Sequence, residues 1–83
     1  MNHYKILVVD DESRMRKLLN DFLSASGYEI LEAEDGQKAL DIYHEQPDIH
    51  LVILDVMMPI LDGWSTLREI RKSSKVPVIM LTA

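Results

Sequence analysis

Apolar residues along this chain form either short continuous runs or helically spaced patterns. Continuous runs of four to eight residues are typical of strands buried on both faces. Three such runs are Lys5–Val9, His50–Leu54 and Val76–Leu81. A weaker alternation at Tyr28–Ala33 predicts a further strand. Pro77 has no N–H to donate, so we expect regular pairing of the last strand to begin at Val78.

Three stretches between these strands have apolar residues at helical spacing. The clearest follows an i, i+3, i+4, i+7, i+8 pattern, with Met15, Leu18, Leu19, Phe22 and Leu23. Gly27 then suits a left-handed helix C-cap. A second, shorter helix is predicted around Ala39, Leu40 and Tyr43. A third should begin after Asp62, whose carboxylate suits an N-cap.

The predicted order, strand–helix–strand–helix–strand–helix–strand, is the pattern of an α/β fold. Such alternation predicts a parallel sheet with right-handed crossovers and helices on both faces. A chain of 83 residues is one domain at most and has a modest core.

Composition excludes several functional classes. The net charge of −5 argues against a nucleic-acid surface. The chain has no cysteine, which excludes disulfides, a thiol nucleophile and cysteine-type zinc sites. The start, MNHYKILVVDD, lacks a signal peptide's apolar stretch, and no run is long enough to cross a membrane. We therefore expect a cytoplasmic protein that makes no contact with membranes.

Acidic residues follow two of the predicted strands directly. Asp10 and Asp11 end the first strand and Asp55 ends the third, while Thr82 ends the fourth. Ligands of open parallel sheets bind beyond the carboxyl ends of the strands. If these strands are neighbours, three carboxylates meet at one edge and raise one another's pKa. A hard divalent cation such as Mg²⁺ relieves that repulsion, so the pattern suggests metal-assisted phosphoryl chemistry with a carboxylate nucleophile.

Three motifs occur in order along the chain: VVDDE at 8–12, LDVMMPILDG at 54–63 and VPVIMLTA at 76–83. Together they resemble the receiver domain of bacterial two-component response regulators, and IRKSSKVPVIMLTA resembles the OmpR/PhoB-type transcription regulators. The resemblance runs from Met1 to Ala83. It implies a flavodoxin-like, doubly wound parallel sheet, here incomplete, with strands in the order 2-1-3-4.

The resemblance also assigns roles to residues. Asp55 would accept a phosphoryl group from a sensor histidine kinase. Asp11 and Asp55 would bind Mg²⁺ directly, Asp10 through water, and the Met57 backbone carbonyl would be a further ligand. Thr82 would be the hydroxyl that moves toward the acyl phosphate.

Other parts of the motif would shape and support the same pocket. Backbone N–H groups after Asp55 and at Ala83 would hold phosphoryl oxygens, and Pro59 and Gly63 would shape the loop that leaves the site. The protein would be a signalling phospho-acceptor and not an enzyme. DNA would be bound only through an output domain that this chain does not contain.

A full receiver continues to a fifth strand with a lysine that pairs with the phosphoryl group. We therefore expect residues 1–83 to be the N-terminal part of one receiver domain, with impaired phosphorylation. An unpaired Val76–Leu81 edge and an uncovered face of the first helix would favour self-association by edge pairing or segment exchange.

Alternative interpretations remain open from the residues alone. The cluster Arg14, Arg16 and Lys17 is either a solvated helix face or a docking surface for the kinase. A phosphorylation-incompetent folding or interaction module is one rival function. A small Mg²⁺-dependent aspartyl-phosphate phosphatase is another, although Asp10-Asp11-Glu12-Ser13 does not match its D-x-D-x-T motif.

Overall fold

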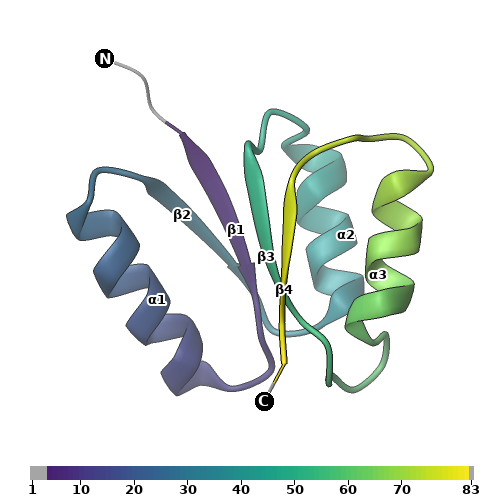
Figure 1. The fold of residues 1–83 in the computed structure, drawn as a ribbon, viewed down its shortest axis with the longest axis horizontal. Helices are drawn as coiled ribbons and strands as arrows, with labels where there is room; N and C mark the ends of the chain where they lie inside the picture. Colours follow the sequence, from purple (N-terminus) through teal and green to yellow (C-terminus); the bar gives the residue numbers. More distant parts are fainter. Residues whose placement is uncertain (1–3, 83) are drawn as a thin grey trace.

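The computed structural model describes residues 4–82 and contains all seven predicted elements (Figure 1). In chain order they are β1 (Lys5–Val9), α1 (Ser13–Ala25), β2 (Glu29–Ala33), α2 (Gly36–Glu45), β3 (Leu51–Asp55), α3 (Gly63–Arg71) and β4 (Val78–Leu81). The element boundaries differ from the predicted ones only slightly. Regular pairing of β4 begins at Val78, as the position of Pro77 predicted. No helix in this part of the chain is both long and apolar enough to cross a bilayer.

The four strands form one parallel sheet in the order β2-β1-β3-β4. Helix α1 covers one face, and α2 and α3 lie together on the other (Figure 1). This arrangement confirms the expected α/β class and the incomplete flavodoxin-like sheet order. It also makes β1 and β3 the two central strands, with β4 at one edge.

The core is divided by the sheet into two layers of unequal size. The larger lies between the sheet and helices α2 and α3, and it includes Leu7, Leu54 and Ile70. The smaller lies under α1 around Ile6, Val8 and Ile53. Successive strand residues point to opposite faces, so both layers draw on β1 and β3. Burying each such side chain stabilises the fold by about 1.5–3 kcal/mol, which explains why these central strands are almost entirely apolar.

The helix ends follow the predicted capping chemistry. Gly27 has φ +96°, its N–H donates to the Ser24 carbonyl, and the Tyr28 N–H donates to the Leu23 carbonyl. This pair of bonds is the Schellman motif, and glycine makes its left-handed residue inexpensive. At α3, the Asp62 carboxylate accepts a hydrogen bond of 2.8 Å from the Ser65 N–H. The predicted cap role of Asp62 is therefore confirmed.

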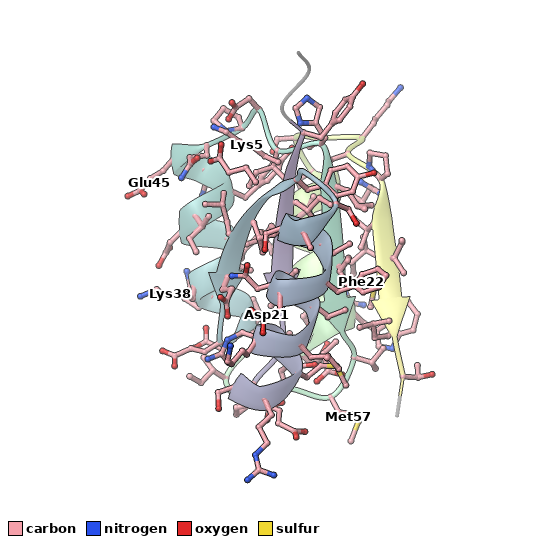
Figure 2. The ribbon with its side chains drawn as sticks, turned by 90° about the vertical axis from the view of Figure 1, so that its left-hand side faces the viewer. Lys5, Asp21, Phe22, Lys38, Glu45 and Met57 are labelled. Atoms are coloured by element: carbon pink, nitrogen blue, oxygen red, sulfur yellow. The ribbon has the colours of Figure 1, made fainter. Side chains whose placement is uncertain are left out.

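The α1 side of the sheet is only partly covered. Large apolar side chains are exposed there: Leu18 and Phe22 on α1, and Ile79 on β4. Figure 2 shows Phe22 on the side of α1 toward β4 in this view. We call Leu18, Phe22 and Ile79 the open apolar surface.

Gly36 generates a prediction about the packing of α2 on α3. A Cβ added at Gly36 would overlap Thr66 Oγ1 and lie 2.5 Å from the Leu61 carbonyl oxygen. A backbone carbonyl cannot rotate out of the way, so we expect Gly36→Ala to lower the free energy of unfolding by about 1–3 kcal/mol. Urea unfolding followed by circular dichroism measures the change. The adjacent, exposed Gln37→Ala is the control, and equal stability of the two variants would contradict this packing.

Candidate functional site

The carboxyl ends of β1, β3 and β4 enclose a hollow of about 290 Å³. The parallel register pairs Val9 with Leu54 and Asp55 with Leu81, so the residues after these strands are brought together. The hollow is lined by Asp10, Asp11, Glu12, Met15, Asp55, Met57, Leu81 and Thr82. Of the site residues predicted from the sequence, this lining includes Asp10, Asp11, Asp55, Met57 and Thr82, but not Pro59 or Gly63. Ala83 lies outside the described residues.

Three carboxylates converge in this hollow. Asp10, Asp11 and Asp55 each offer one oxygen, and these oxygens all lie within 4.8 Å of one another. Asp10 is buried, with 8% of its surface exposed, whereas Asp55 is half-buried and Asp11 is exposed. The predicted meeting of acids far apart in the sequence is therefore present in the structure.

Asp10 lies in an environment that disfavours its ionised form. Burial raises the pKa of its carboxyl group, and the charges of Asp55, Asp11 and Glu12 raise it further. One hydrogen bond opposes this effect, since the Glu12 N–H donates to Asp10 Oδ1 at 2.9 Å. The net effect is a raised pKa for the Asp10 carboxyl group.

Asp55 is the last residue of β3 and is held from several sides. Its Oδ1 accepts a hydrogen bond of 3.3 Å from the Met57 N–H. The next residue is tied to β4, because the Val56 N–H donates to the Leu81 carbonyl at 3.0 Å. The Val56 carbonyl in turn accepts from the Gly63 N–H at 3.0 Å. The backbone beneath the carboxylate is thus fixed to both β4 and α3.

Gly63 and Ile60 shape the loop between β3 and α3. A Cβ at Gly63 would overlap the Asp55 carbonyl oxygen, so only glycine allows α3 to begin this close to the acid. Ile60 has φ +71°, and the Leu61 N–H donates to the Pro59 carbonyl at 2.7 Å, which closes a γ-turn. A positive φ costs a β-branched residue on the order of 1–2 kcal/mol. No sequence signal marked Ile60, because glycine or asparagine is the usual sign of such a turn.

Thr82 borders the hollow and is exposed. Among residues 4–82, no lysine lines the hollow. Lys5 lies at the start of β1, at the opposite end of the sheet, and forms an ion pair of 2.8 Å with Asp48.

Arg16 differs from its neighbours in the basic cluster. Its Nη1 donates to the Asp10 backbone carbonyl at 2.7 Å, and its Nε donates to Glu32 Oε1 at 3.3 Å. Only 17% of its side chain is exposed. The interpretation of Arg14, Arg16 and Lys17 as one solvated face is therefore wrong for Arg16. Sequence reasoning missed this contact because it depends on the β1–β2 pairing.

The donor set fits a hard divalent cation. Mg²⁺ prefers oxygen ligands, commonly takes one or two carboxylates and retains several waters. Asp11 and Asp55 expose carboxylate oxygens to the hollow, and the buried Asp10 adds a third negative charge close by. These three residues are the ones that could hold such an ion.

Comparison with known proteins agrees with this geometry. The response regulator receiver domain family matches residues 6–83. The probable transcriptional regulator ycf27 of Guillardia theta is 55% identical over 80 residues, covering 95% of this chain and 31% of that protein. The uncharacterized transcriptional regulatory protein YrkP of Bacillus subtilis is 49% identical over 80 residues, covering 96% of this chain and 34% of that protein. The chain thus spans about a third of the length of these curated relatives.

Solved structures give the same result. The response regulator TrrA of Thermotoga maritima, determined in complex with Mg²⁺-BeF, has a TM-score of 0.90 and 46% identity over 96% of this chain and 70% of that one. A response regulator receiver domain protein from Clostridium thermocellum has a TM-score of 0.91 and 41% identity over 95% of this chain and 64% of that one. The sheet order, the converging acids and the matched family agree, and the chain belongs to the response regulator receiver domain family.

Proposed function

We propose that this chain is the phospho-acceptor part of a two-component receiver, in which Asp55 takes a phosphoryl group from a histidine of a sensor kinase. The observation that supports this most is the convergence of Asp10, Asp11 and Asp55 within 4.8 Å at the end of two central strands. The intact parent would work in the cytoplasm and control an output domain that binds DNA. Relatives named as transcriptional regulators support that output.

The proposed chemistry is a displacement at phosphorus. An Asp55 carboxylate oxygen forms the new O–P bond, and the P–N bond of the phosphohistidine breaks with its electron pair going to the imidazole. Mg²⁺ bound by Asp11 and Asp55, with Asp10 acting through water and the Met57 carbonyl as a further ligand, would neutralise the phosphoryl oxygens. Thr82, at the rim of the hollow, would donate a hydrogen bond from its hydroxyl group to one of these oxygens.

A second candidate function is an interaction module that holds no stable phosphoryl group. Metal binding without efficient phosphorylation would distinguish this module from a competent receiver.

The role of Asp55 gives the first test. We expect the unmodified chain to bind Mg²⁺ in calorimetry and Asp55→Asn to weaken that affinity at least about tenfold, because a direct ligand is lost. With Mg²⁺ and acetyl phosphate, intact mass should show slow and partial formation of one phosphoryl adduct on the unmodified chain, as expected for impaired phosphorylation, and none on Asp55→Asn. Glu34→Gln, an exposed change of equal charge, is the control. Normal Mg²⁺ binding by Asp55→Asn would refute the site.

Asp10 gives a second test, in which stability and metal binding should change in opposite directions. Without metal, Asp10→Asn should raise the free energy of unfolding on the order of 1 kcal/mol at neutral pH, because the cost of burying a charge and then the like-charge repulsion are both removed. The raised Asp10 pKa means that the ionised carboxylate costs stability above that pKa. The advantage of Asp10→Asn should therefore shrink as pH falls through it and vanish below the ordinary value of 3.8.

Urea unfolding at neutral and mildly acidic pH measures this difference, again with Glu34→Gln as the charge control. Addition of Mg²⁺ should stabilise the unmodified chain more than Asp10→Asn. An Asp10→Asn variant less stable than the unmodified chain without metal would contradict the account of repulsion.

We also propose that this chain self-associates through the edge of β4 and the open apolar surface. An uncovered strand edge beside exposed apolar side chains is a template for pairing with a second copy. Phe22 is 70% exposed and Ile79 is 49% exposed, which leaves much apolar area to bury.

Sedimentation velocity at micromolar concentration should show dimers or larger species for the unmodified chain. Phe22→Ser and Ile79→Lys should shift the distribution toward monomer, since each removes apolar area or adds a charge at the edge. Trp64→Ser, which removes an exposed aromatic residue on α3, should leave it unchanged. A stable monomer of the unmodified chain would disprove self-association.

A further inference from the structure

We propose that Arg16 is a positioning residue for the acidic hollow: it clamps the Asp10 backbone so that the neighbouring carboxylates are held ready for a cation. The inference rests on the proposed function of the hollow as a Mg²⁺ site. The contacts that support it do not depend on metal binding, because they are the hydrogen bonds that hold the backbone at the end of β1.

The Asp10 peptide is held from both sides. Its N–H donates to the Ala33 carbonyl of β2 at 3.1 Å. Its carbonyl oxygen accepts the 2.7 Å hydrogen bond from Arg16 Nη1. A charge-assisted bond to a carbonyl is stronger than a neutral one, so the peptide units on both sides of Asp10, just after β1, have little freedom to turn.

Arg16 is itself fixed by a partner on β2. Its Nε donates to Glu32 Oε1 at 3.3 Å, and Asn20 Nδ2 donates to the other carboxylate oxygen at 2.7 Å. Glu32 therefore holds two side chains from successive turns of α1. The guanidinium fork is suited to bridging a carbonyl and a carboxylate at once, whereas a lysine ammonium lacks that fork.

Further hydrogen bonds connect Arg16 to the acidic segment from Asp10 to Glu12. The Arg16 N–H donates to the Glu12 carbonyl at 3.1 Å, and the Glu12 N–H donates to Asp10 Oδ1 at 2.9 Å. Side chain and backbone of Arg16 thus contact both ends of the segment that carries Asp10 and Asp11. Release of this segment would let the two carboxylates move apart, as their mutual repulsion favours.

The direction of the change in Mg²⁺ affinity on replacing Arg16 distinguishes a positioning role from a purely electrostatic one. Arg16 is a cation near a cation site, so loss of its charge alone would strengthen Mg²⁺ binding. Arg14 lies exposed in the first turn of the same helix, and Arg14→Met makes the same charge change without touching Asp10. A positioning role predicts that Arg16→Met weakens Mg²⁺ binding although it removes a positive charge.

The experiment is calorimetric titration of the chain with Mg²⁺, together with amide hydrogen exchange without metal. We expect Arg16→Met to weaken affinity about tenfold, as lost supporting contacts at metal sites commonly do, and to speed exchange of the Glu12 N–H. Arg14→Met should leave exchange unchanged and affinity equal or tighter. Arg16→Lys should recover part of the affinity.

Two outcomes would overturn the inference: Arg16→Met binding Mg²⁺ as well as Arg14→Met, or unchanged Glu12 exchange in Arg16→Met. If circular dichroism shows that Arg16→Met does not fold, Glu32→Gln decides the question, because it weakens the hold on Arg16 while leaving the guanidinium in place. Glu32→Gln should then weaken affinity more than Glu34→Gln, which makes the same charge change at an exposed site, and should speed exchange of the Glu12 N–H. Equal effects of the two variants would refute the clamp. If the unmodified chain binds no Mg²⁺, the proposed function fails, while the exchange result still tests the clamp.

Discussion

The parallel pairing of β1 with β3 is the constraint on which the rest of this structure depends. It places the residues after two non-consecutive strands side by side, and so joins Asp10 and Asp11 to Asp55 across more than half the chain. The pairing is stabilised by apolar residues on both faces, including Leu7, Val8 and Leu54, which are fully buried. Burial of the continuous apolar run holds the strand in the centre of the sheet. The strand in turn determines the position of the acidic residue at its end.

Burial and charge act against each other at the end of that strand. The sheet shields Asp10 from water while its acidic neighbours repel it, and both effects raise its pKa. A fold selected only for stability would avoid this arrangement. The cost is accepted at functional sites where an ion or ligand later relieves it. Under the proposed function, Mg²⁺ bound in the hollow would relieve the repulsion that weakens the ligand-free molecule.

Most of the fold and much of the site followed from local sequence patterns. Continuous runs such as Lys5–Val9 identified the central strands, and Asp62 identified the start of α3 because its cap chemistry is local. The convergence of the acids could be expected once the sheet order was assumed. That order came from family resemblance, because periodicity alone does not say which parallel strands are neighbours.

The features that sequence reasoning missed depend on contacts between distant segments. Arg16 looked like one of three similar basic residues, and only the position of β2 gives it Glu32 as a partner. Ile60 has a positive φ because the loop between β3 and α3 must turn tightly. Isoleucine is not a residue from which a positive φ would be predicted. Local propensity cannot reveal a conformation that tertiary structure imposes against it.

The strained turn at Ile60 has a consequence for the evolvability of this chain. Ile60 is 82% exposed, so its side chain contributes little packing to offset its unfavourable backbone. A conformationally better suited residue at that surface position would leave the core and the acidic hollow untouched. A stabilising substitution in this loop could therefore compensate for destabilising substitutions elsewhere in the protein, including substitutions of the acidic residues in the hollow.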